Sequence, residues 1–261
     1  MAAEAIIIPQ VLVTGASGFI ATHIIQQLLT GGQVKVRGTV RSFKNESKVK
    51  PLQDLVPDAT YPLELVEGDL LNEESWKEAV KGCTHVYHVA SPLPSSAPQD
   101  ENQLVRPAVE GTLNVLKACA EAGTVKRVVL TSSMAAISGG LHGVEGHVYT
   151  ENDWMPEDGL PAYEKSKILA EKAAWDFLEK LEDDKKFELI TVQPGVVIGP
   201  PLTVATTEST SLSSVKKVIS NEIPVLLNIN LPLVDVRDVA KAQIVAMEKI
   251  RDSRKTFHYY S

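Results

Sequence analysis

The chain contains, near its beginning, the stretch Val11-Leu12-Val13-Thr14-Gly15-Ala16-Ser17-Gly18-Phe19-Ile20-Ala21. Residues 6–13 are mostly apolar, which is typical of a buried strand. Gly15 allows a sharp turn, and Gly18 has no Cβ, so a pyrophosphate can approach the backbone there. The helix expected over residues 18–29 points its free N–H groups and the positive end of its dipole at this turn. A structural turn alone could explain the glycines, but the strand before them and the helix after them favour dinucleotide binding.

Composition and charge narrow the class of protein. The 261 residues are 44% apolar and 23% charged, as in an ordinary globular domain. The net charge of −7 argues against a nucleic-acid surface, and no apolar run reaches the ~20 residues of a membrane helix. Residues 1–8 lack a signal-peptide pattern. Cys83 and Cys119 have no metal-ligand spacing and suit a reducing compartment. We therefore expect a cytoplasmic protein with no metal, nucleic-acid or membrane partner.

Strand and helix signals alternate along the chain. Strands are expected over residues 6–13, 34–40, 63–67, 85–90, 127–131, 188–193 and 256–260. Helices are expected over residues 18–29, 48–55, 72–80, 101–122, 161–181 and 236–250. This alternation predicts an α/β fold with a doubly wound parallel sheet of the Rossmann type, with ligands at the carboxyl ends of the strands. We interpret residues 1–261 as one dinucleotide-binding domain.

The pattern becomes less regular after Pro194. Eight of the twelve residues at positions 203–214 are Ser or Thr. This composition suggests a mobile segment within the same domain. We assign residues 195–235 to a small, partial substrate-binding region.

The end of the second expected strand indicates which dinucleotide binds. An NAD-preferring fold carries an acidic residue here, which binds the ribose 2′-hydroxyl. This chain has no acidic residue between Arg37 and Asn45, and it has Arg41, Lys44 and Lys48 in and just after this stretch. A guanidinium binds a phosphate dianion through two hydrogen bonds, so these cations favour NADP(H). The alternative is that the two lysines only solvate the start of a helix.

Catalytic groups are suggested by the pair Tyr163 and Lys167. Residues four apart on a helix share a face, and a nearby cation lowers the pKa of a phenol toward neutrality. Such a tyrosine can exchange a proton with a carbonyl or an alcohol. The pair alone is a common pattern. The hydroxyls of Thr131-Ser132-Ser133, at the end of an expected central strand, could bond the same carbonyl oxygen and strengthen the assignment.

Together these motifs resemble the extended short-chain dehydrogenase/reductase family. Within it they are similar to the dihydroflavonol-reductase-like group, which includes fungal methylglyoxal reductases and plant cinnamoyl-CoA reductases. The matching motifs span nearly the whole chain and are Val13-Thr14-Gly15-Ala16-Ser17-Gly18-Phe19-Ile20, Thr39-Val40-Arg41, Gly68-Asp69-Leu70, His88-Val89-Ala90-Ser91-Pro92, Thr131-Ser132-Ser133, Tyr163 to Lys167, Ala170-Glu171-Lys172-Ala173-Ala174-Trp175 and Asp235-Val236-Arg237-Asp238-Val239-Ala240.

The resemblance implies a role for each matching residue. Tyr163 would donate the proton, Lys167 would hold the nicotinamide ribose and lower the tyrosine pKa, and Ser133 would bond the substrate carbonyl. The implied cofactor ligands are Gly15, Ser17, Gly18, Phe19 and Ile20 at the turn, Arg41 and Lys48 at the 2′-phosphate with Lys44 as a further helper, Asp69 and Leu70 beside adenine, Ala90 and Ser91 along the cofactor channel, and Pro194, Gly195 and Val197 beside the carboxamide.

Two departures from the family pattern affect the expected activity. Ala108 stands where many members carry an Asn for a water relay. The family also continues beyond a final strand like residues 256–260, so we expect an incomplete substrate pocket with weak turnover. The same loss would expose an apolar patch at Leu226, Leu227, Ile229 and Leu231, which favours self-association. We expect a monomer or a weak homo-oligomer.

The resemblance implies an NADPH-dependent reductase that transfers a hydride to the carbonyl of a small aldehyde or ketone. One alternative is a nucleotide-sugar epimerase or dehydratase, which would need a substantial C-terminal lobe for its nucleotide. Another is a non-enzymatic dinucleotide sensor, which would not need Ser133, Tyr163 and Lys167. A third is a truncated, inactive protein that still binds NADP.

Overall fold

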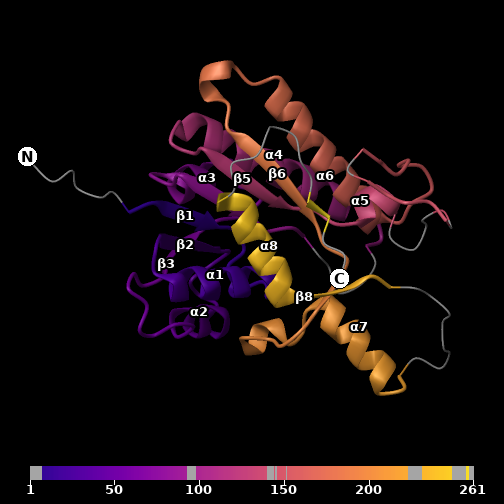
Figure 1. Ribbon diagram of the computed structural model, residues 1–261, viewed down its shortest axis with the longest axis horizontal. Coiled ribbons are helices and arrows are strands. Elements are labelled where there is room, and N and C mark those ends of the chain that lie inside the picture. Colours follow the sequence, from indigo (N-terminus) through magenta and orange to yellow (C-terminus); the bar gives the residue numbers. More distant parts are fainter. Residues whose placement is uncertain are drawn as a thin grey trace, which may run out of the picture.

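The computed structural model describes residues 8–92, 98–139, 144, 146–150, 152–222, 231–248 and 257–258. Within these ranges the main element is a sheet of seven parallel strands in the order β3-β2-β1-β4-β5-β6-β9 (Figure 1). The strands are β1 (Gln10–Val13), β2 (Lys35–Val40), β3 (Glu64–Glu67), β4 (His85–His88), β5 (Arg127–Thr131), β6 (Glu188–Gln193) and β9 (Phe257–His258). The strand order reverses between β1 and β4, as in a doubly wound sheet, and confirms the predicted α/β fold class.

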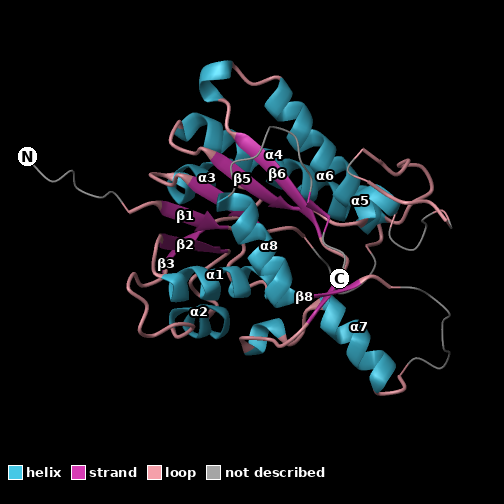
Figure 2. Ribbon diagram, in the orientation of Figure 1, coloured by secondary structure: helices cyan, strands magenta, loops and turns pink. Residues whose placement is uncertain are grey.

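Helices cover both faces of the sheet (Figure 2). The first face carries α1 (Phe19–Gly31), α2 (Glu46–Gln53) and α8 (Val236–Glu248), and the second carries α3 (Glu73–Val80), α4 (Asn102–Ala122) and α6 (Ala162–Glu179). Successive side chains of a strand point to opposite faces. Val11 and Val13 therefore pack in the core of the first face, and Leu12 packs in the core of the second.

Several predicted boundaries were wrong, and in one case the cause is visible. The strand expected over residues 85–90 ends at His88 because the N–H groups of Val89 and Ala90 donate to the hydroxyl of Thr14, at 3.0 and 2.9 Å. The helix expected over residues 48–55 begins at Glu46 and ends at Gln53. The first strand is described from Gln10, and only residues 257–258 of the last one are described.

Residues 195–235 contain regular structure that the sequence analysis missed. β7 (Val196–Ile198) and β8 (Leu233–Asp235) form a second, two-stranded parallel sheet. Between them lie the 3₁₀ turn η3 (Val204–Thr206) and helix α7 (Thr210–Ile219), which were not predicted, whereas the expected mobility of residues 203–214 stays a prediction. Thr203 and Thr206 form a reciprocal capping box around η3.

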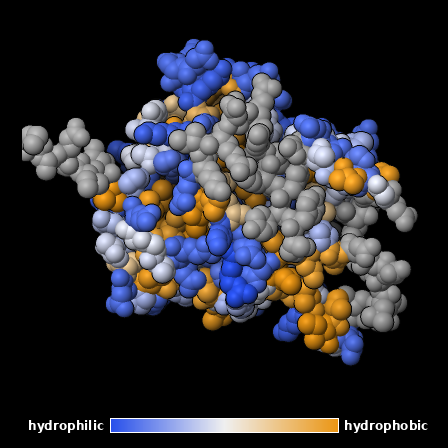
Figure 3. Space-filling view, viewed as in Figure 1, coloured by the Kyte–Doolittle hydropathy of each residue, from blue (hydrophilic) through white to orange (hydrophobic). Residues whose placement is uncertain are grey.

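Helix α7 packs loosely and carries apolar residues on the surface (Figure 3). Val218 is 53% exposed and Ile219 is 77% exposed. Of the predicted apolar patch, Leu231 is 43% exposed, whereas Leu226, Leu227 and Ile229 lie outside the described residues. The predicted self-association through this patch stays a prediction.

A further short helix, α5 (Ala135–Ser138), follows β5 and was not predicted from the sequence.

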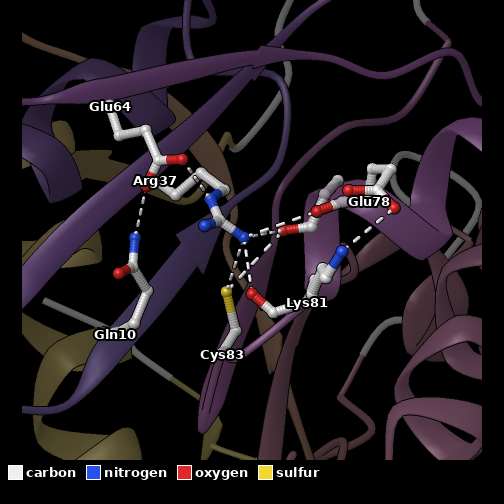
Figure 4. A network of polar contacts seen from close by, with 7 residues as sticks. Gln10, Arg37, Glu64, Glu78, Lys81 and Cys83 are labelled. Atoms are coloured by element: carbon white, nitrogen blue, oxygen red, sulfur yellow. Dashed lines mark hydrogen bonds and ion pairs between the residues drawn. The ribbon is translucent and has the colours of Figure 1, made fainter.

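Arg37 on β2 joins three strands to the end of α3 (Figure 4). Its Nη1 donates to the carbonyl oxygens of Ala79 at 2.9 Å and Lys81 at 2.7 Å, where the last carbonyls of a helix need donors. Its Nε pairs with Glu64 of β3 at 3.0 Å, and Glu64 also accepts from Gln10 of β1 at 2.7 Å. This network fixes α3 against the strands at the amino-terminal edge of the sheet.

We expect Arg37→Ala to lower the free energy of unfolding by about 2–3 kcal/mol, because half-buried carbonyls lose charge-assisted hydrogen bonds. Urea denaturation measures this change. Lys81→Ala is the matched control, since it removes only an exposed ion pair with Glu78 and keeps the Lys81 carbonyl. Exposed pairs contribute little, so the control should match the native protein. Equal losses in the two variants would show that the Arg37 contacts do not stabilise the fold.

Candidate functional site

The carboxyl ends of the strands open into a cleft with a volume of about 1070 Å³. All of the residues to which the sequence analysis gave a cofactor or catalytic role line this one cleft, apart from the proposed helper Lys44. They are Gly15, Ser17, Gly18, Phe19, Ile20, Arg41, Lys48, Asp69, Leu70, Ala90, Ser91, Ser133, Tyr163, Lys167, Pro194, Gly195 and Val197. Residues widely separated in the sequence are thus brought to the edge where ligands of doubly wound sheets bind.

The turn between β1 and α1 passes very close to its neighbours. Gly15 has a φ of +68°, and a Cβ built on it would lie 3.1 Å from Ala90. The N–H groups of Gly15 and Ala16 donate to Thr39 of β2, at 2.9 and 2.8 Å. Gly18 is exposed and no side chain caps the first turn of α1. The amino end of α1 therefore presents backbone N–H groups and a positive dipole end to the cleft, which suits a phosphate.

Thr14 and His88 form a buried pair beneath this turn. The Thr14 hydroxyl accepts from two backbone N–H groups of the chain after β4, so its own proton is donated to Nδ1 of His88, 2.9 Å away. This assigns the His88 proton to Nε2. Burial, and to a smaller extent the positive charge of Lys167, lower the pKa of His88 to about 3. His88 is therefore a neutral, buried packing residue.

Two cations stand at the end of β2. Arg41 is exposed and Lys48, on the first turns of α2, is half-buried, and both line the cleft together with Ser42 and Asn45. Within the described ranges neither cation forms an ion pair with a carboxylate of the chain. Their charges therefore remain available for an anionic ligand.

The loop after β3 is held in place by its own polar groups. Asp69 Oδ1 accepts from the N–H of Leu71 at 2.8 Å, and the Leu70 carbonyl accepts from the side chain of Asn114 at 2.8 Å. A Cβ on Gly111 of α4 would lie 2.7 Å from Leu70, so the glycine makes room for this side chain. Asn114 thus fixes Leu70 at the cleft wall.

Ser133, Tyr163 and Lys167 line the same cleft from the turn after β5 and from the first turns of α6. The turn that carries Ser133 is tied to β6 by hydrogen bonds from Ser132 N–H to Val192 O (2.9 Å) and from Met134 N–H to Pro194 O (3.1 Å). Tyr163 lies on the first turn of α6. Lys167 Nζ lies 5.8 Å from the centre of the tyrosine ring and donates to Ser91 Oγ at 3.2 Å. A carbonyl in the cleft would face two hydroxyls and an ammonium here.

The segment after β7 contributes cleft residues that the sequence analysis did not assign. These are Ala205, Thr206, Glu208, Ser209, Thr210 and Ser211. The pattern Thr203-x-x-Thr206 was a usable signal, because hydroxyls at this spacing cap helical turns. Immediately before β7, Gly195 packs against Pro232, and a Cβ on Gly195 would lie 2.2 Å from the Pro232 carbonyl oxygen.

Other classes of site find little support in the described part of the chain. No group of three or more His, Cys, Asp or Glu side chains within it could hold a metal ion. None of the helices within it has the length and apolar character that a membrane crossing requires. Cys83 and Cys119 are buried free thiols, and burial raises the pKa of Cys83 to about 11.

Comparison with known proteins bears out the resemblance predicted from the motifs. The model of the NAD dependent epimerase/dehydratase family matches residues 11–259. The dihydroflavonol 4-reductase of Arabidopsis thaliana is 40% identical over 216 residues, which are 79% of this chain and 54% of that protein. Cinnamoyl-CoA reductase CAD2 of Medicago truncatula is 37% identical over 243 residues, 91% of this chain and 72% of that protein. The chain thus spans about half the length of the first curated relatives it matches.

Solved structures give the same result. The yeast methylglyoxal/isovaleraldehyde reductase Gre2, complexed with NADPH, is similar with a TM-score of 0.83 and 31% identity, over 96% of this chain and 78% of that one. Vestitone reductase from alfalfa is similar with a TM-score of 0.75 and 29% identity, over 96% of this chain and 76% of that one.

We expect Gly15→Ala to lower the free energy of unfolding by about 2–4 kcal/mol, from the positive φ and from crowding against Ala90. Gly82→Ala is the control, because Gly82 has a φ of +73° but no atom within 4 Å of the position that an added methyl group would take. It should lose only the conformational part, about 1–2 kcal/mol. Chemical denaturation of both variants compares them. A Gly15 loss no larger than the Gly82 loss would show that the approach to Ala90 does not require glycine.

Proposed function

The chain belongs to the NAD dependent epimerase/dehydratase family, and we propose that it is an NADPH-dependent reductase of small aldehydes or ketones. The observation that carries the proposal is that Ser133, Tyr163 and Lys167 line the same cleft as the residues that suit a dinucleotide phosphate. The proposal is also supported by the similar reductase that was solved with NADPH. A cytoplasmic location belongs to the same proposal.

The cleft has features in its described residues that suit NADPH. Gly15 and Gly18 leave the turn without side chains where a pyrophosphate would lie, and Arg41 and Lys48 supply unpaired cations for a 2′-phosphate. Leu70 would lie beside the adenine, and Gly195 beside the nicotinamide. When bound, NADPH supplies the hydride that the protein's own side chains cannot supply.

Ser133, Tyr163 and Lys167 would act on the substrate. The hydroxyls of Ser133 and Tyr163 would bind the carbonyl oxygen and stabilise the negative charge that develops on it. Tyr163 would donate its proton to that oxygen, and the Lys167 ammonium would favour the resulting phenolate. We assign residues 195–235 to part of the substrate wall, through the hydroxyls of Thr206 and Ser209 that line the cleft.

Turnover is tested by following NADPH oxidation with methylglyoxal and isovaleraldehyde as probes, beside a fluorescence titration of NADPH. We expect saturable binding and measurable turnover of at least one probe. Binding without turnover of either probe or of a wider panel of aldehydes and ketones would contradict the reductase assignment. It would then favour an NADP-binding protein without this activity.

We expect the native protein to bind NADPH more tightly than NADH, and Arg41→Ala to lose about 1.5–3 kcal/mol of NADPH binding energy, as for a hydrogen bond to a charged group. The binding of NADH, which has no 2′-phosphate, should stay the same. Fluorescence titration with both cofactors measures the two affinities.

Lys44→Ala is the matched control, because Lys44 is an exposed cation of the same loop that does not line the cleft. It should leave both affinities close to native. Equal affinity of the native protein for the two cofactors would contradict the assignment to NADPH.

We expect Tyr163→Phe to lower kcat by roughly 10²–10⁴-fold with nearly unchanged NADPH affinity, because only the proton donor is removed. Lys167→Ala should reduce both kcat and NADPH affinity. Tyr61→Phe serves as control, since Tyr61 lies under Lys35 and outside the cleft. Near-native turnover by Tyr163→Phe would remove this tyrosine from the mechanism.

A further inference from the structure

Glu171 is a buried carboxyl one helical turn beyond Lys167 on α6. The residue is only 2% exposed. Its Oε1 accepts hydrogen bonds from Gln193 Nε2 at 2.8 Å and from Trp175 Nε1 at 3.4 Å. Tyr163, Lys167 and Glu171 are spaced four residues apart, so they form one stripe along the helix that runs from the cleft into the protein.

The second oxygen of the Glu171 carboxyl, Oε2, lies in different surroundings from Oε1. Oε2 is fully buried and makes no hydrogen bond of normal geometry within the described residues. Glu171 lines a small cavity beside the main cleft, together with Lys167 and Ser132. The cavity has a volume of about 10 Å³, which is roughly what one water molecule requires, and polar residues that could bind a water line it beside the apolar Ala90, Leu130 and Ala170.

The surroundings of Glu171 favour the neutral acid. A buried carboxylate is stable only if it is paired or fully hydrogen-bonded, and within the described residues no cation forms an ion pair with Glu171. Burial raises the pKa of Glu171, and the opposing contacts with the side chains of Ser132, Thr191, Trp175 and Gln193 do not cancel this rise. The carbonyl-like Oε1 accepts two N–H donors, so the proton belongs on Oε2.

Among the described residues that line the cavity, Lys167 is the only charged neighbour of Glu171. The chain after β4 contributes Ser91, α4 contributes Thr112, and the end of β5 with the turn after it contributes Thr131 and Ser132, all neutral hydroxyls. His88 on β4, close enough to sense the Lys167 charge, is neutral at any working pH. A proton leaving Glu171 through the cavity therefore has Lys167 as its acceptor.

We propose that Glu171 is a neutral acid that restores the proton of the Tyr163–Lys167 pair after each turnover, through one water molecule in this cavity. The proposal rests on the proposed reductase function. Tyr163 loses its O–H proton to the product alkoxide, and its phenolate takes a proton from the Lys167 ammonium. The resulting amine takes a proton from the water, which takes the proton of Glu171 Oε2. Glu171 is left as a carboxylate and regains its proton from solvent once product has left the cleft.

The protonation state is tested without any activity. The infrared difference spectrum of native protein minus Glu171→Gln at pH 7 should contain the C=O band of a protonated carboxyl. Glu179→Gln, an exposed glutamate two turns further along α6, should give only a carboxylate difference. Absence of the protonated band would overturn the proposal.

The pH dependence of the unfolding constant gives an independent check that Glu171 is protonated in the folded protein. Because the folded-state pKa of Glu171 is raised, the native state keeps a proton that the unfolded chain releases above pH ~4.3. The unfolding constant of native protein should therefore rise relative to that of Glu171→Gln, about tenfold per pH unit, until Glu171 ionises. A difference that does not change with pH would overturn the neutral acid. Since glutamine has the shape of the neutral acid, the variant should fold.

The relay is tested by comparing the first turnover with later ones. With isovaleraldehyde and bound NADPH, Glu171→Gln should keep the single-turnover rate within about twofold, because Tyr163 already holds its proton. Its steady-state kcat should fall tenfold or more, so that a burst of one product per site appears. Glu179→Gln should behave like native protein in both measurements. An equal loss in first and later turnovers, as expected from a merely structural role, would overturn the relay.

The outcomes separate this inference from the proposed function. A native protein that shows the protonated band but neither binds NADPH nor reduces a carbonyl would overturn the reductase and the relay together, and would leave the neutral acid established. A native protein that turns over normally but lacks the band would overturn only the role of Glu171.

Discussion

The end of β1 is fastened to the strands on both of its sides, and the geometry of the cleft depends on this. Thr14 accepts the N–H groups of Val89 and Ala90 from the chain after β4, and Thr39 of β2 accepts the N–H groups of Gly15 and Ala16. These bonds end the strand pairing early and leave no room for a side chain at Gly15. The N–H groups at the start of α1 stay without side-chain caps and face the cleft, where an anion would satisfy them.

Helix α6 organises, in a comparable way, the part of the cleft that Ser133, Tyr163 and Lys167 line. Its buried stripe ends at Glu171, which binds Gln193 of β6, while the backbone of β6 binds the turn that carries Ser133. Gln193 also donates to Thr191 at 2.9 Å, so its side chain has little freedom. The helix that presents Tyr163 and Lys167 is thus held in register with the Ser133 turn by buried polar contacts. Such contacts fix relative positions more closely than apolar packing alone.

The sequence was informative where structure depends on neighbours along the chain. The β1–α1 turn, the alternation of strands and helices and the Tyr163–Lys167 pair could be predicted because turn glycines, period-two strands and one-turn spacings are local signals. The pairing of Thr14 with His88 could not, since it joins residues 74 apart in the sequence. Likewise, β7 and β8 are short strands whose pairing partner lies far along the chain, and a run of Ser and Thr reads as a loop unless its capping pattern is noticed.

Helix α1 connects the β1–α1 turn to the chain after β7, which belongs to the proposed substrate wall. His23 of α1 is buried, and its Nε2 lies 2.9 Å from the Pro200 carbonyl oxygen in the chain that follows β7. Burial lowers the pKa of His23, so the neutral imidazole donates this bond at working pH. Helix α1 therefore begins at the proposed phosphate site and, one turn later, holds the segment that leads to Thr206 and Ser209. A displacement of α1 by ligand at Gly18 would move this wall as well, because helices shift as rigid bodies against packed neighbours.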